Sequence, residues 1–155
     1  MSGTLTIKCI DRDERSVKEA LRLVLRVFLE YDAPLFSPEG KETFRAYVYS
    51  GVIERSLSEG LAHMAAAFDG DMIAGVMASD IYGHIMIAFV DGDYQHCGTG
   101  RALFEGIKVL VDADAFTVNA APPGYPFYKA LGFVPDGAER TVDGLVFTPM
   151  TLALR

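Results

Sequence analysis

The sequence predicts one mixed α/β domain over residues 1–155, with a mostly antiparallel sheet flanked by helices. The length of 155 residues is that of one domain. Hydrophobic residues make up 50% of the chain and charged residues 23%, a composition typical of a folded globular protein. Helix-spaced apolar residues and apolar runs of strand length also alternate along the chain.

The first strand and helix follow from two different periodicities. Polar and apolar residues alternate from Thr4 to Ile10, which predicts an opening strand. Ser16 and Glu19 have the spacing of a capping box, which predicts a helix start. Apolar residues then follow at helical spacing as far as Phe28. This helix should end before Pro34, because proline disfavours a helical predecessor.

A second helix and three strands are predicted next. Ser37-Pro38 is typical of a helix start, and Gly51 of the residue that ends a helix. Asp69-Gly70 and Tyr82-Gly83 are turn sequences that favour an antiparallel meander. The apolar runs that these turns separate are Leu61 to Phe68, Met72 to Ser79 and His84 to Val90.

The remaining elements alternate between helix and strand. Apolar spacing predicts a helix over Gly98 to Val111 and a short strand over Phe116 to Asn119. Phe127 to Leu131 should form a short helix that ends at Gly132. Leu145 to Leu154 should form a last strand, paired with the segment before Asp143-Gly144.

Charge and cysteine content exclude several classes of protein. Lys plus Arg is 14 and Asp plus Glu is 21, so the net charge is −7, which argues against gripping a nucleic-acid backbone. The acidic balance mildly favours a cationic substrate. Cys9 and Cys97 are too few for a disulfide framework or a zinc site. The chain has no long apolar run and its N-terminus is charged, so we expect a cytoplasmic protein without a membrane segment.

The loop after the His84 to Val90 strand is the most informative stretch. Gly98 and Gly100 open the following amphipathic helix. Amide groups at a helix start lack internal partners and carry partial positive charge, and glycine lets a ligand approach them. The loop is therefore suited to a pyrophosphate. It is neither a Rossmann loop, since Leu103 stands in place of the third glycine, nor a Walker A loop, since it has no Gly-Lys-Ser/Thr.

Two blocks of this sequence resemble one family. Gln95-x-x-Gly98-x-Gly100 with Arg101-Ala102-Leu103 is similar to the acetyl-CoA loop of the GCN5-related N-acetyltransferases (GNATs). The segment from Thr117 to Phe133 resembles that family's closing strand and helix. The resemblance implies a sheet of six to seven strands and about four helices, with the fourth and fifth strands splayed apart.

The resemblance also implies where acetyl-CoA binds. Backbone groups of Phe89 and Val90 would pair with pantetheine and the acetyl carbonyl, in the manner of an added strand. Asn119 would lie near the cofactor arm, although a strand-end cap is an equal alternative. The side chains of His96 and Cys97 are also consistent with a plain solvent-facing loop. The amides that would hold the pyrophosphate run through the loop: Gln95, His96, Cys97, Gly98, Thr99, Gly100 and Arg101.

Tyr128 is the catalytic residue that the resemblance implies. Its phenol would act as general acid to the departing CoA thiolate, and the alternative is a buried core tyrosine. A base is needed to take a proton from the acceptor amine. His84, Asp32 and Asp80 are candidates, but each also fits a purely structural role, so the base stays unassigned.

The predicted function is transfer of the acetyl group of acetyl-CoA to a primary amine of a small molecule or peptide by direct attack. No metal, nucleic acid or membrane is implied, and relatives of this kind suggest a homodimer. Two alternatives remain: a non-catalytic module that binds acyl-CoA as a sensor or partner domain, and an α/β domain whose glycine turn binds no CoA.

Overall fold

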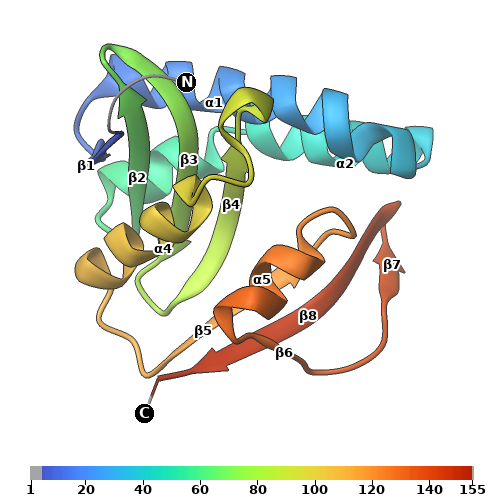
Figure 1. The fold of residues 1–155 in the computed structure, drawn as a ribbon. Helices are drawn as coiled ribbons and strands as arrows, with labels where there is room; N and C mark the ends of the chain where they lie inside the picture. Colours follow the sequence, from blue (N-terminus) through green and yellow to red (C-terminus); the bar gives the residue numbers. More distant parts are fainter. Residues whose placement is uncertain (1–4, 155) are drawn as a thin grey trace.

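The computed structural model describes residues 5–154, and one mixed sheet runs through it (Figure 1). Thr4, predicted to open the first strand, lies outside the described residues. The strands are β1 (Thr6–Cys9), β2 (Ala62–Asp69), β3 (Met72–Asp80), β4 (His84–Val90), β5 (Ala115–Ala120), β6 (Val134–Pro135), β7 (Arg140–Val142) and β8 (Leu145–Ala153). The α-helices are α1 (Glu14–Val27), α2 (Pro38–Tyr49), α3 (Val52–Ser58), α4 (Thr99–Leu110) and α5 (Tyr125–Leu131).

The strand order is β1-β2-β3-β4-β5-β8-β6, with β7 paired along β8. The meander predicted for β2, β3 and β4 is confirmed, because both pairs are antiparallel. Its first turn contains Gly70 at φ 61°, in the left-handed region that glycine adopts readily. The predicted pairing of the last strand is also confirmed, since β7 pairs antiparallel with β8.

β4 and β5 are the parallel neighbours in this sheet, and they separate soon after they meet. Their register contains His84↔Thr117 and Ile85↔Val118, at the start of β4. From Ile87 to Val90, β4 pairs with β3 alone within the described sheet. The predicted splay is therefore confirmed. We call the gap between the carboxyl-terminal parts of β4 and β5 the wedge. Its open end lies at the carboxyl ends of these two strands.

The two faces of the sheet pack in two hydrophobic clusters. On β2, Met64 and Ala66 face α1, while Ala65 and Ala67 face α4. This alternation is the period of two expected for a strand buried on both faces. The α4 cluster continues through β5 to Tyr128 on α5 and Met150 on β8. The wedge therefore has α1 and α2 on one side and α4 and α5 on the other (Figure 1).

The start of α1 differs from the prediction. The helix begins at Glu14, and its N-cap is Asp13, whose carboxylate accepts hydrogen bonds from the Ser16 amide at 3.2 Å and the Ser16 hydroxyl at 2.8 Å. Ser16 therefore lies inside the first turn, and the expected capping box with Glu19 is wrong. Aspartate is as good an N-cap as serine. Asp13 lies three residues before Ser16 and accepts from the Ser16 amide, which has no partner within the helix. The prediction that this helix ends before Pro34 is confirmed, because α1 gives way to a π-helical turn, η1 (Phe28–Asp32).

α2 is held against the β7–β8 turn by a close backbone contact. Ser37 caps the helix as predicted, accepting from the Gly40 amide at 3.1 Å. The carbonyl oxygen of Gly144 occupies the space that a Cβ at Gly40 would need. Thr43 donates to the carbonyl of Asp143 at 2.7 Å beside it. Gly51, at φ 82°, separates α2 from α3, a short helix that the sequence reading did not predict.

We predict that Gly40→Ala destabilises the protein by about 1–3 kcal/mol, because the new methyl would displace the backbone of Gly144. Urea denaturation measures the change. Gly137→Ala is the matched control, since a Cβ there meets nothing within 4 Å and its φ is not positive. Equal midpoints for the two variants would contradict the contact.

Candidate functional site

The loop from β4 to α4 combines a short 3-10 turn with two left-handed residues. The turn η3 (Gly92–Tyr94) follows Asp91, whose side chain accepts from the Asp93 amide at 2.9 Å. His96 at φ 61° and Gly98 at φ 87° then reverse the chain, and α4 begins at Thr99. Left-handed residues next to a helix start turn successive amides toward one side of the chain.

Tyr94 fixes this loop to the rest of the molecule. Its ring is buried, and its hydroxyl donates to the carboxylate of Asp69 at 2.5 Å. That hydrogen bond, together with burial, raises the pKa of Tyr94 to about 12. The carbonyl of Tyr94 accepts from the Thr99 hydroxyl at 3.0 Å and the Cys97 thiol at 2.8 Å. One residue therefore joins the β2–β3 turn to the first turn of α4.

Arg26 of α1 holds the start of the loop. Its guanidinium donates to the Asp91 carboxylate at 2.8 Å. Burial alone would raise the pKa of Asp91, but the amide of Asp93 and the charge of Arg26 outweigh it and lower that pKa. Asp91 therefore stays ionised and keeps the loop in place at neutral pH.

The first turn of α4 presents bare amide groups. Ala102 is the first helix residue to donate back, to the carbonyl of Gly98 at 3.0 Å. Within residues 5–154, the amides of Gly98, Thr99, Gly100 and Arg101 donate to no protein group. Free amides at a helix start form a site for an anionic oxygen. Of the predicted run from Gln95 to Arg101, the structure leaves the amides at the start of α4 bare, whereas the Gln95 amide donates to the carbonyl of Gly92 at 3.4 Å.

The free edge of β4 lies next to this turn. The Asp91 amide donates to the carbonyl of Ala74 at 2.8 Å, so Asp91 and Ala74 form a hydrogen-bonded pair of the β3–β4 ladder. Hydrogen-bonded and non-hydrogen-bonded pairs alternate along an antiparallel ladder. Phe89 is therefore in the next hydrogen-bonded pair, opposite Val76 on β3. The peptide groups of Ala88 and Val90 therefore face the wedge. Gln95 confirms this direction, since its side-chain amide donates to the carbonyl of Val90 at 2.9 Å.

α5 packs directly on the start of α4. A Cβ at Gly100 would lie 2.7 Å from the Phe127 ring, so the second glycine of the motif is required by this contact as well as by any ligand. Arg101 donates to the carbonyl of Ala130 at 3.4 Å. These contacts fix the position of Tyr128, the neighbour of Phe127, relative to the bare amides.

Tyr128 is buried, with 6% of its surface exposed, and packs edge-on against Phe127 and Phe133. Burial raises its pKa well above the usual range for tyrosine, and the nearby charge of Asp32 raises it further. Its hydroxyl donates to no described residue, and no buried polar side-chain atom lacks a partner among them, so the hydroxyl reaches the surface of the wedge. Tyr128 is therefore a neutral hydrogen-bond donor.

Asn119 lies in the wedge without a structural partner. Phe116 and Val118 of β5 are buried in the α4 cluster, so the alternate residue Asn119 points to the opposite face. Its side chain is exposed and forms no hydrogen bond within the described part of the chain. The alternative of a strand-end cap therefore has no contact to support it.

The three candidate bases lie in different places. His84 bonds through Nδ1 to the Thr117 hydroxyl at 2.8 Å, and Asp80 accepts from the amides of Tyr82 and His84. Both residues lie where β4 begins. A strand rises about 3.4 Å per residue, so His84 is about 20 Å along β4 from Val90, at the other end of the strand from the bare amides. Asp32, at the end of η1, interacts electrostatically with Tyr128. Of these three, Asp32 is the one whose charge acts on Tyr128.

Sequence reasoning missed Tyr94, Ala88 and the role of Phe127. The partner of Tyr94 is 25 residues away in the chain, and no local pattern marks it. Ala88 could have been found, because alternation along β4 decides which peptide groups face outward.

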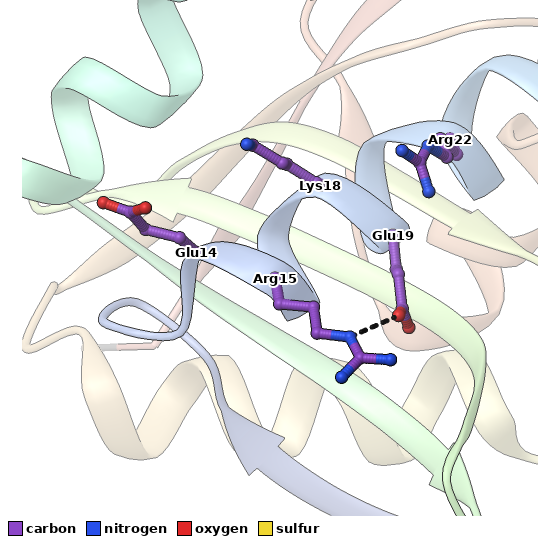
Figure 2. A pocket seen from close by; sticks show the side chains of 5 residues that line it. All are labelled: Glu14, Arg15, Lys18, Glu19 and Arg22. Atoms are coloured by element: carbon purple, nitrogen blue, oxygen red, sulfur yellow. Dashed lines mark ion pairs between the residues drawn. The ribbon is translucent and has the colours of Figure 1, made fainter.

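An open hollow along the outer surface of α1 is a second surface feature (Figure 2). Its charges have both signs, and Arg15 pairs with Glu19 at 3.5 Å across it. The hollow has no buried polar group and lies on the side of α1 away from the sheet. We therefore place the functional site in the wedge. The residues that line the hollow are Glu14, Arg15, Lys18, Glu19 and Arg22.

The chain belongs to the GNAT acetyltransferase family, because the family model for the acetyltransferase (GNAT) domain matches residues 32–154. It is thus an acetyl-CoA-dependent N-acetyltransferase by family. No curated protein matches the sequence. None of the helices in residues 5–154 has the length and apolar character needed to cross a bilayer.

Solved structures share the fold over nearly the whole chain. A GCN5-related N-acetyltransferase from Rhodopseudomonas palustris is 19% identical with a TM-score of 0.77, covering 99% of this chain and 98% of that one. PaiA N-acetyltransferase from Thermoplasma acidophilum, solved with coenzyme A, is 14% identical with a TM-score of 0.72, covering 97% and 99%. YjaB from Escherichia coli is 24% identical with a TM-score of 0.69, covering 98% of each chain. At these identities the likeness shows the fold alone.

We predict that Thr99→Val lowers the free energy of unfolding by about 1–2 kcal/mol, because the Tyr94 carbonyl loses its hydroxyl partner while side-chain volume is kept. Thr99→Ser, which retains the hydroxyl, is the control. Urea denaturation of the unliganded protein measures both. A valine variant as stable as the serine variant would show that this hydrogen bond does not hold the loop.

Proposed function

We propose that this enzyme transfers the acetyl group of acetyl-CoA directly to a primary amine of a small molecule or peptide, in a complex that holds both substrates. The observation that supports this most is the arrangement at the open end of the wedge. The bare amides from Gly98 to Arg101 follow a loop whose Gln95 side chain binds the free edge of β4 at Val90. Tyr128 is next to Phe127, which packs on Gly100 in the same helix turn.

The CoA pyrophosphate would bind the amides of the first turn of α4. Gln95, His96 and Cys97 would shape the loop around it, and Gly98, Thr99, Gly100 and Arg101 would donate. Pantetheine would extend along β4 as an added strand. We propose pairing through Val90 and Ala88. The predicted pairing through Phe89 is not kept, because the register directs the peptide groups of Phe89 to β3, and its ring packs on Phe44 at 5.6 Å. Asn119, on the facing strand, would contact the cofactor arm.

Backbone amides on the free edge would also serve the chemistry. The acetyl carbonyl develops negative charge when the amine attacks, and an amide aimed at that oxygen stabilises it. Ala88 and Val90 are the residues of β4 whose amides face the wedge. Since these amides belong to a strand held by β3, they are oriented before substrate binds.

Tyr128 would assist the departure of the thiolate. A phenol at its ordinary pKa near 10 is a weaker acid than a thiol near 8.5, so complete proton transfer is uphill by about 2 kcal/mol, and burial increases this cost. The favourable role is a hydrogen bond to sulfur as the C–S bond breaks. The sulfur then takes the phenol proton as the phenol takes one from the new amide nitrogen. Because its pKa is raised, Tyr128 stays protonated throughout the neutral range.

We predict that Tyr128→Phe lowers kcat about 100-fold and leaves the Kd for acetyl-CoA unchanged, because the ring still packs while the hydroxyl is lost. Tyr125→Phe, on the same helix, is the matched control. Steady-state thiol release gives kcat, and isothermal titration gives the Kd. Wild-type turnover by the phenylalanine variant would remove Tyr128 from the mechanism.

The test of the proposed function measures binding and turnover separately. CoA at 100 times its Kd should stabilise the fold by about 2.7 kcal/mol. Acetyl-CoA with a panel of primary amines should release thiol and yield acetylated amine. Stabilisation without thiol release would favour the alternative, a non-catalytic acyl-CoA-binding module. Absence of any stabilisation by CoA would contradict both.

A further inference from the structure

The segment of residues 28–36 crosses the open end of the wedge. Its buried side chains are Phe28, Ala33 and Phe36, and they pack with Phe89 of β4 and Ala121 just after β5. The segment therefore contacts the carboxyl-terminal part of β4 and the residue that follows β5. We call residues 28–36 the bridge segment.

Further contacts fix the bridge segment in position. Phe28 stacks on Phe44 of α2, with ring centroids 4.1 Å apart. The hydroxyl of Tyr31 lies against the Gly92 backbone. It occupies the space that a Cβ at Gly92 would need. The segment is thus held by α2 and by the loop that leads to the bare amides, and its polar side chains have defined places.

Asp32 is the acidic residue of this segment that lacks a counter-ion. Glu30 pairs with Arg26 at 3.8 Å, whereas Asp32 forms no ion pair or hydrogen bond with any residue of the described chain. It is nevertheless half-buried. Burial raises its pKa from 3.8 to about 6, so at neutral pH the site holds a largely ionised carboxylate with no positive partner. A buried charge without a partner is costly and favours a function in binding.

Asp32 lies within electrostatic range of Tyr128. The charge of Asp32 contributes to the raised pKa of Tyr128, which shows that the two groups lie within electrostatic range. Arg26, the basic residue that precedes the bridge segment in α1, is already engaged by Glu30 and Asp91. An acceptor between Asp32 and the thioester would therefore meet one uncompensated negative charge.

We propose that Asp32 binds the ammonium group of the acceptor and so makes the enzyme selective for primary alkylammonium acceptors. This inference rests on the proposed function and deepens it. A cation beside Asp32 supplies the missing partner. The bound ammonium gives one proton to water before its nitrogen attacks the thioester carbon. Among the described residues, no three His, Cys, Asp or Glu side chains gather to hold a metal, which favours an organic cation at this carboxylate.

The first test is thermal stability in the absence of substrate. The folded state holds the Asp32 proton more tightly than the unfolded chain, so between about pH 4 and pH 6 stability falls as pH rises. Asp32→Asn removes this penalty. We expect a higher Tm than wild type at about pH 7.5 and a difference that vanishes near pH 4. A variant with a lower Tm at neutral pH would show that Asp32 has a partner and overturn the inference.

The second test is kinetic and uses n-butylamine and spermidine as cationic acceptors, with trifluoroethylamine as an acceptor that is largely neutral at the same pH. For Asp32→Asn we expect kcat/KM for the cationic amines to fall about 30-fold or more, while that for the neutral amine changes little. The KM for acetyl-CoA should stay at the wild-type value. Asp32→Glu should restore part of the preference for cations, and Glu30→Gln, on the same segment, should behave as wild type.

The outcomes separate this inference from the proposed function. If wild type turns over the amines and Asp32→Asn keeps the same preference for cationic acceptors, the inference is wrong and the transferase stands. If Asp32→Asn loses activity equally toward cationic and neutral amines, or its KM for acetyl-CoA rises, Asp32 does not select the cation. If wild type releases no thiol with any of the three amines although CoA stabilises it, the proposed function and this inference both fail.

Discussion

The early divergence of β4 from β5 is the constraint on which the rest of this structure depends. The ladder between these strands holds only at the start of β4, so the carboxyl-terminal half of β4 keeps one edge of peptide groups without a partner strand. An open edge between two strands in the middle of a sheet would close if the flanking elements allowed it. The bridge segment packs on β4 and on Ala121, the residue after β5, on one side of the wedge. On the other side, α5 packs on the start of α4.

Two titratable groups around the wedge keep one protonation state near neutral pH. Burial and the nearby Asp32 keep Tyr128 a neutral phenol, able to donate a hydrogen bond. Asp91 stays ionised through Arg26 and anchors the loop. Asp32 differs, because its pKa of about 6 leaves it close to titration and its charge has no partner in the described chain. A site that is neutral on one face and anionic on the other would draw a cationic acceptor toward the thioester.

Most of the fold could be predicted from local patterns. The meander, the splay, the glycine that ends α5 and the pairing of the last strand depend on periodicity and turn chemistry within short windows, or on two well-spaced motif blocks. The predicted start of α1 is wrong because Asp13 and Ser16 are both good caps, and the residue that caps the helix is Asp13, with Ser16 inside the first turn. α3 was missed because its seven residues are too short for a clear helical period.

The site could be predicted only as far as its motifs extend. The bare amides follow from the glycines, and Tyr128 follows from the resemblance. The hydrogen bond from Tyr94 to Asp69, the contact of Phe127 with Gly100 and the electrostatic interaction of Asp32 with Tyr128 join residues far apart in the chain. No local pattern encodes those contacts, because they arise from the packing of separate elements. Asp32 was one of three candidate bases by residue type, and its placement distinguishes it from the other two.

The central claim is that the first turn of α4 and the free edge of β4 together hold CoA, and amide NMR tests it most directly. Titration of the labelled protein with CoA should shift the backbone amides of Gly98, Thr99, Gly100 and Arg101 together with those of Ala88 and Val90. All six should saturate with one Kd, since a single molecule contacts both places. Shifts confined to other parts of the chain, or α4 amides that stay unchanged at saturating CoA, would contradict the account.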